Sequence, residues 1–453
     1  MSVRDCLAVV VVSALVVALL GLFRLYQVKA GPPAERVRKL FHVCTGVLGL
    51  TLPWIFDRFA PVLTLAILAL AGVAVIRLSH RLREGVGQVL FAVRRDSFGE
   101  LCYVLGILLL FWLSKGDKIL YVVPLLMLAI ADTAAALIGQ QYGKLRFRPV
   151  DGGKSIEGAI AFFFTAFFCV HVPVLVWSGA GRMESLLISI NLSVLTMLAE
   201  AAAWWGLDNL IIPLWGYLLL RSQIHMTANG LFSDLAFVVI LSFVVWLWRN
   251  RTTLADDTLC GAILWDYVVW TVGGWQWTLP PLIVLITYET VSRNSALDRL
   301  HGFRFPVVLA QVAGAAVWLL MYRQTANTAL FYPFTSCFAA DVSIIGLVRL
   351  YSAQPTIGWR EAILINTAKS LMVIVPSIVA MDGVGGRALL GIGACSLAVL
   401  ASTVMFYQLQ PNLADFPVDT PRWIRQALVV AAASPIAWLL LSETTSRHAL
   451  ASL

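Results

Sequence analysis

The chain contains few charged residues. Only 13% of its 453 residues are Asp, Glu, Lys or Arg, whereas 60% are apolar. A soluble domain carries about 25% charged and about 45–50% apolar residues. This composition excludes a disordered chain, because disorder requires low hydrophobicity. It also excludes an ordinary water-soluble enzyme, because a single core could not cover so much apolar surface.

The sequence also lacks several signatures of soluble and extracellular folds. None of the seven cysteines forms a CxxC pair, and the six histidines show no ligand spacing to one another, which argues against a zinc site. The alternating pattern of membrane barrel strands is absent. No Walker A loop occurs, so a P-loop nucleotide site is not expected.

Apolar runs of about 20 residues, the length needed to cross a bilayer, recur along the chain instead. We therefore predict an all-α fold, a polytopic integral membrane bundle of roughly 14 transmembrane helices. The runs lie at about 6–23, 40–57, 61–76, 100–114, 119–140, 158–178, 184–206, 230–248, 260–292 (one long span or a tight pair), 306–322, 328–348, 361–381, 387–408 and 424–442.

The cationic residues, 33 Lys and Arg against 25 Asp and Glu, concentrate in the loops after the first, third and fifth runs. Those loops share one face, which the positive-inside rule makes cytoplasmic. The cations form no continuous stripe, so we expect contact with the membrane and no nucleic-acid partner. No organelle transit peptide is evident, and we expect a bacterial cytoplasmic membrane as the location.

A polar stretch at 249–259 (RNRTTLADDTL) interrupts the apolar pattern near the middle of the chain. It predicts two membrane domains, residues 1–250 and residues 260–453.

Three carboxylates stand out in the first half, namely Asp132, Glu200 and Asp208. An Asp at the centre of a membrane helix costs roughly 2.5–3.5 kcal/mol, so it usually faces a partner or a polar cavity. Carboxylates that share a site with phosphate oxygens are typical Mg²⁺ ligands. We predict a Mg²⁺ site formed by these three residues. The alternative for each is a structural carboxylate paired with Lys or Arg.

The loop at 143–158 (GKLRFRPVDGGKSIEG) is the densest polar stretch of the chain. It carries four cations and two adjacent glycines, and Ser155 is placed to cap the helix that follows. A helix N-terminus with glycine amides and a lysine favours phosphate binding. Arg38 and His42 share one side of an earlier helix on the same face. The alternatives are a plain positive-inside loop and an interfacial anchor.

These segments resemble the phytol kinase and dolichol kinase family. The resemblance rests on VRKLFHVCTG, ADTAAALIGQQYGK, GGKSIEGAIAFF and AEAAAWWGLDNLIIP, in that order, across about residues 36–248. It implies a membrane enzyme that transfers the γ-phosphate of CTP to a long-chain isoprenoid alcohol such as phytol, geranylgeraniol or a polyprenol, with Mg²⁺ as cofactor. It implies catalytic roles for Asp132, Lys154 and Asp208. The residues expected to bind the nucleotide triphosphate are Arg38, His42, Lys144, Gly153, Lys154, Ser155 and Glu157.

The second half resembles, more faintly, the membrane family that includes plant phytyl-phosphate kinases, which convert the monophosphate to the diphosphate. Asp341 and Gly346 of that pattern are present, but Val342 replaces a Thr and a Glu is missing. Asp341 also echoes Asp132, and Lys369–Ser370 echoes Lys154–Ser155. The second half is therefore a second kinase, a degenerate structural repeat or an unrelated domain.

Three other functions remain open. A cytidylyltransferase related to those that make CDP-diacylglycerol would share the overall likeness, but its late His-Gly-Gly and Asp-Arg signature is absent. A secondary transporter would also show membrane carboxylates and two related halves, although it would place its charges near the midplane. A structural membrane protein would not need so many polar groups in one loop. We favour the kinase.

Overall fold

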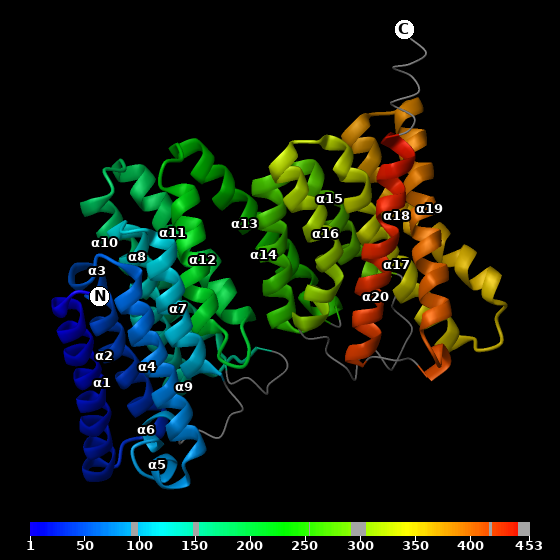
Figure 1. The fold of residues 1–453 in the computed structure, drawn as a ribbon. Coiled ribbons are helices and arrows are strands. Elements are labelled where there is room, and N and C mark those ends of the chain that lie inside the picture. Colours follow the sequence, from blue (N-terminus) through cyan, green and yellow to red (C-terminus); the bar gives the residue numbers. More distant parts are fainter. Residues whose placement is uncertain (92–97, 148–153, 253, 291–304, 416–418, 443–453) are drawn as a thin grey trace. The chain divides into compact units, whose positions relative to one another are not determined.

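The computed structural model describes residues 1–91, 98–147, 154–252, 254–290, 305–415 and 419–442. Regular structure in these ranges is helical, apart from an isolated bridge between Arg146 and Ser155 (Figure 1). The chain divides into two compact units, Met1–Leu241 and Ser242–Leu453. The boundary falls inside α13 (Ala228–Trp248), just before the polar stretch at which the sequence predicts a division.

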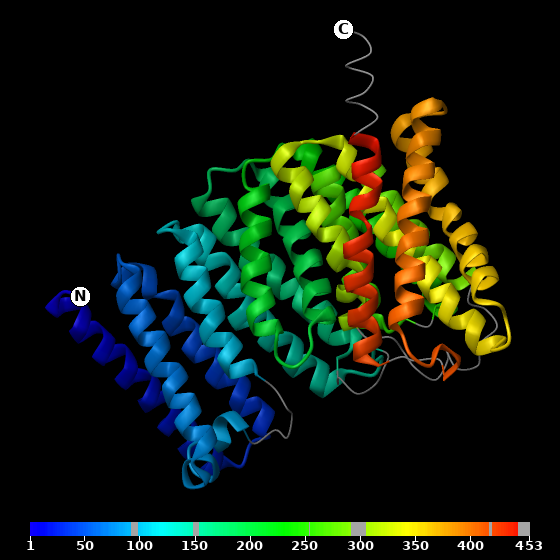
Figure 2. The ribbon, with the colours of Figure 1, turned by 45° about the vertical axis from the view of Figure 1, so that its right-hand side comes forward.

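The first unit is a bundle of long helices joined by short connections. Its helices are α1 (Val3–Ala30), α2 (Ala34–Leu50), α3 (Leu52–Ile55), α4 (Phe59–Leu78), α5 (His80–Glu84), α6 (Gln88–Phe91), α7 (Gly99–Ser114), α8 (Lys118–Leu126), α9 (Asp132–Tyr142), α10 (Ile156–Trp177), α11 (Arg182–Ala202), α12 (Asp208–Gln223) and the start of α13. Both ribbon views show α1 at one edge of this unit (Figures 1 and 2). It packs there against α2 and α4.

The second unit surrounds one buried helix. The helix α17 (Phe331–Ala353) is buried along its length by contacts with its neighbours, and its apolar residues form the centre of the largest core cluster. The other helices of the unit are α14 (Asp256–Gly273), α15 (Trp275–Thr290), α16 (Phe305–Thr325), α18 (Trp359–Asp382), α19 (Gly386–Leu409) and α20 (Thr420–Ala433).

Eleven helices in the described part of the chain are long and apolar enough to cross a membrane. The protein is therefore an all-α, multi-pass membrane protein, as predicted, but the count of roughly fourteen spans is not confirmed. The run at 260–292 is a pair of helices, because Gly274 adopts a positive φ of 79° between α14 and α15. The run at 40–57 is broken at Thr51 into α2 and α3.

The helix α12 is not among the apolar runs that the sequence predicts. It begins at Asp208 and continues through Pro213. Tertiary contacts hold it in place, since the Asn209 amide donates to the Gly99 carbonyl oxygen at 2.9 Å. A Cβ atom on Gly106 of α7 would lie 2.6 Å from the Asn209 carbonyl oxygen, so glycine permits the close approach of α7 and α12.

The helix that carries Asp132 is interrupted immediately before that residue. A π-helical turn, Met127–Ala131, joins α8 to α9. Such turns add a residue to the helix locally, and they occur frequently at functional sites. Pro124 lies one turn earlier and removes a backbone donor from the helix.

Candidate active site

Three carboxylates from three helices meet in the first unit. Asp132 is the first residue of α9, Glu200 lies in the last turn of α11, and Asp208 is the first residue of α12. One oxygen from each lies within 4.8 Å of one from each of the others. Asp132 and Glu200 are buried, and Asp208 is partly exposed. These are the three residues that the sequence nominates as metal ligands.

Two groups of α2 contact Asp132. The Lys39 ammonium lies 2.5 Å from the Asp132 carboxylate, and both side chains are buried. The His42 Nε2 atom is 3.8 Å from the same carboxylate oxygen and 3.3 Å from the Leu128 carbonyl oxygen. Charges placed so far from water persist because each has an opposite partner.

A second lysine holds Glu200. The Lys154 ammonium lies 3.0 Å from the Glu200 carboxylate and also donates to the Glu200 carbonyl oxygen. Burial acts to lower the pKa of Lys154, but the neighbouring Glu200 and Asp208 carboxylates outweigh it and raise the pKa above its ordinary value. Lys154 is therefore a permanent cation beside the carboxylates.

The loop that carries Lys154 is closed by two residues of the GGKSIEG segment. Ser155 caps α10 as predicted, since its hydroxyl accepts a hydrogen bond from the Gly158 amide at 3.1 Å. The Glu157 carboxylate accepts hydrogen bonds from the Lys144 and Leu145 amides at 2.9 and 3.1 Å. Glu157 thus ties the two ends of the loop together. Gly153, the remaining nominated residue of the loop, lies outside the described residues.

Two nominated cations lie outside the carboxylate cluster. Lys144 is exposed. Arg38 pairs with Glu35 on its own helix at 2.6 Å and is partly exposed. Within the described residues, the structure shows no hydrogen bond or ion pair from either cation to the three carboxylates, but the charge of Arg38 acts on both Asp132 and Asp208.

Sequence reasoning gave no site role to Lys39, although it lies beside Arg38 and is paired with Asp132. The signal was present in the spacing of α2. Four of its five buried residues, Lys39, His42, Gly46 and Gly49, recur at intervals of three and four, so they form one helix face. A Cβ atom on Gly46 would lie 2.5 Å from the Ala129 side chain, which shows how closely this face meets the π-helical turn.

The donor set fits a magnesium ion. Carboxylate oxygens are the hard ligands that Mg²⁺ prefers, and three of them converge here from separate helices. The two lysines Lys39 and Lys154 hold Asp132 and Glu200 in place.

The second unit arranges its corresponding residues differently. Asp341 is buried in α17 and accepts a hydrogen bond from the Gln426 amide at 2.5 Å. The Lys369 ammonium donates to the Asn366 side chain at 3.4 Å, and the Ser370 hydroxyl donates to the Thr367 carbonyl oxygen at 2.6 Å. Among the described residues, metal-capable side chains gather in threes only at Asp132, Glu200 and Asp208.

Comparison with known proteins identifies two relatives that match part of the chain. The chain is 33% identical to a phytol kinase of Synechocystis sp. over 184 residues, which is 40% of this chain and 76% of the relative. It is 30% identical to the dolichol kinase EVAN of Arabidopsis thaliana over 216 residues, which is 44% of this chain and 37% of that protein. No family model matches the chain. No solved structure matches it either.

The match to the Synechocystis protein covers 76% of that relative, and 33% of the aligned residues are identical. The same chain aligns with a kinase of a second isoprenoid alcohol. The protein therefore belongs to the family of phytol and dolichol kinases.

Proposed function

We propose that the first unit is a kinase that transfers the γ-phosphate of a nucleoside triphosphate, CTP, to the hydroxyl group of an isoprenoid alcohol. The observation that carries the proposal is the meeting of Asp132, Glu200 and Asp208 beside Lys39 and Lys154. The two curated relatives, named phytol kinase and dolichol kinase, supply the class of acceptor.

Each group has a role that follows from its charge and position. Lys154, held at the start of α10 by its contacts with Glu200, neutralises charge on the transferred phosphate. Lys39 keeps Asp132 ionised in a buried setting. The oxygen of the alcohol attacks the γ-phosphorus, the bond to the β-phosphate oxygen breaks, and CDP leaves. A carboxylate of the cluster accepts the hydroxyl proton.

Asp132, Glu200 and Asp208 are the residues that would hold Mg²⁺. When bound, the ion would neutralise phosphate charge during the transfer. We place the nucleotide at the loop that carries the exposed Lys144 and the partly buried Lys154. By the positive-inside rule this side of the protein is cytoplasmic.

A product assay tests the proposal. Purified protein is incubated with γ-labelled CTP or ATP, Mg²⁺ and a panel of isoprenoid alcohols, and the lipid products are separated. We expect a labelled lipid monophosphate that requires Mg²⁺ and disappears in excess chelator. Labelled diphosphate would assign a second phosphorylation to the chain and make the unit containing Asp341 its first candidate.

A negative result in this assay would replace the proposed kinase function with that of a secondary transporter. If folded protein forms no labelled lipid from any pair of substrates, the kinase proposal is wrong. The carboxylate cluster would then be examined as an ion site by measuring uptake into vesicles.

A further inference from the structure

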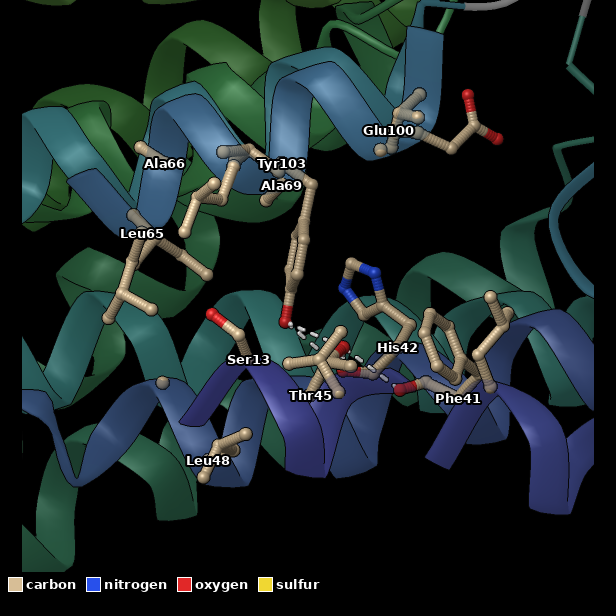
Figure 3. Close-up of a pocket in the computed structure, with 18 of the residues that line it drawn as sticks. Ser13, Phe41, His42, Thr45, Leu48, Leu65, Ala66, Ala69, Glu100 and Tyr103 are labelled. Atoms are coloured by element: carbon tan, nitrogen blue, oxygen red, sulfur yellow. Dashed lines mark hydrogen bonds between the residues drawn. The ribbon is translucent and has the colours of Figure 1, made fainter. Parts of the chain in front are cut away.

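The first unit contains an elongated apolar cavity between α1, α2, α4 and α7 (Figure 3). Its volume is about 310 Å³. Aliphatic side chains make most of its wall, including Val16 of α1, Leu48 of α2 and Ile107 of α7. An apolar cavity of this kind favours a hydrocarbon over a nucleotide.

One end of the cavity reaches the carboxylate cluster. His42 lines the cavity and its ring lies 3.8 Å from Asp132. Asn209, the neighbour of Asp208, also lines it. Figure 3 shows Tyr103 pointing toward Thr45 and His42, and its hydroxyl donates to the His42 carbonyl oxygen at 3.1 Å. The polar groups of the wall therefore gather near the site of phosphoryl transfer.

The other end of the cavity meets a buried apolar cluster. The buried apolar cluster of Val9, Leu52, Phe56 and Val62 lies there, and Leu52 and Val62 also line the cavity. Along α4, lining residues extend from Val62 to Ile76, a distance of about 21 Å at the helical rise. The cavity is thus a long pocket with its polar end at His42 and an apolar far end.

Small residues on α4 make room in this pocket. Ala66, Ala69 and Gly72 line it at intervals of three residues, so they lie along one face of the helix. A Cβ atom added to Gly72 would meet no other atom within 4 Å. Two further lining residues, Val17 and Leu68, are 68% and 50% exposed on the outside of the bundle. The pocket therefore opens between α1 and α4 toward the bilayer.

We propose that the hydrocarbon chain of the acceptor alcohol occupies this pocket, with its hydroxyl group at His42, and that Ala66 and Ala69 limit the length of chain accepted. The inference rests on the proposed kinase function. A large side chain at position 66 or 69 would block the pocket, each at a different distance from its polar end. Ala69 lies one turn nearer the polar end than Ala66, so a side chain at 69 excludes shorter alcohols than one at 66.

The test compares Ala66→Phe and Ala69→Phe with Ala71→Phe, which lies on the opposite, exposed face of α4. Each variant is assayed with geraniol, farnesol and geranylgeraniol. We expect Ala66→Phe to lower kcat/KM for geranylgeraniol by about tenfold or more while farnesol is retained. We expect Ala69→Phe to impair farnesol as well and to retain geraniol, and Ala71→Phe to behave as the wild type.

Two results overturn the assignment of the pocket without touching the kinase function. One is an equal loss for all three alcohols in the Ala66→Phe and Ala69→Phe variants at wild-type melting temperature. The other is wild-type turnover of all three. If the wild type phosphorylates no alcohol, the proposed function itself fails.

A measurement without nucleotide separates these failures. An isoprenoid alcohol with a terminal diazirine is photolysed with the protein in nanodiscs of phosphatidylcholine. We expect crosslinks to peptides containing Val12–Leu20, Leu48–Leu52, Val62–Ala69 or Val104–Leu108, which line the pocket, and protection by excess geranylgeraniol. Labelling outside these peptides overturns the assignment. Labelling there that geranylgeraniol does not reduce also overturns it, because a bilayer phospholipid would then be the occupant.

Discussion

The Lys39 ammonium and the Asp132 carboxylate form a buried ion pair at 2.5 Å, although 93 positions separate the two residues in the chain. This pair joins α2 to α9. It holds one of the three clustered carboxylates ionised and fixes its direction. The first prediction follows from the burial of both partners.

Removal of Lys39 alone leaves Asp132 as an uncompensated buried charge. We expect Lys39→Met to lower the free energy of unfolding by about 3–5 kcal/mol, and the double variant with Asp132→Asn to recover part of this loss. Thermal or denaturant unfolding in detergent measures both. Arg36→Met, at an exposed position of the same helix, is the control. Equal stability of the Lys39→Met and Arg36→Met variants would show that the pair does not stabilise the fold.

The two lysines of the loop at 143–155 have different predicted effects on activity. Lys154 contacts Glu200, whereas Lys144 is exposed. We expect Lys154→Ala to lower kcat by about 10²-fold or more, the usual effect of losing one electrostatic group at a reacting centre. We expect Lys144→Ala to raise the KM for nucleotide and leave kcat nearly unchanged. Steady-state kinetics with labelled CTP distinguish the two, and a larger kcat effect at Lys144 would contradict the assignment.

The raised pKa of Lys154 predicts how its contribution to stability depends on pH. A lysine with a folded pKa above its ordinary value of 10.5 contributes stability at every pH below that value, and loses it only as pH rises through the folded pKa. We expect the difference in melting temperature between the wild type and Lys154→Met to stay constant from about pH 7 to about pH 9. A difference that shrinks across this range would mean that Lys154 loses its proton there.

Sequence reasoning correctly predicted the features of this protein that depend on local composition. Long apolar runs predict its membrane helices, and the position of Ser155 predicts the cap of α10. The helix α12 was missed because Asn209, Pro213 and Arg221 interrupt its apolar run, and contacts with α7 stabilise it instead. The pairing of Lys39 with Asp132 was missed because the two residues are distant in the chain. Tertiary contacts of this kind leave no local signal.

The last of the stability predictions concerns Gly158 in the GGKSIEG segment. A Cβ atom there would lie 2.8 Å from the Ala135 carbonyl oxygen and 3.2 Å from the Gly139 Cα atom. We expect Gly158→Ala to separate α9 from α10 and lower the melting temperature. Gly21→Ala in α1 is the control, because its Cβ would meet nothing within 4 Å and alanine favours a helix by about 1 kcal/mol. A Gly158→Ala variant as stable as the control would contradict the close packing.

The central claim is that Asp132, Glu200 and Asp208 form the centre of phosphoryl transfer, and one comparison tests it most directly. Asp132→Asn and Asp57→Asn, the latter at an exposed position, are purified and shown to melt cooperatively. Both are then given γ-labelled CTP, Mg²⁺ and geranylgeraniol. The account predicts that Asp57→Asn forms labelled lipid phosphate at the wild-type rate and that Asp132→Asn forms almost none. Wild-type turnover by Asp132→Asn would contradict it.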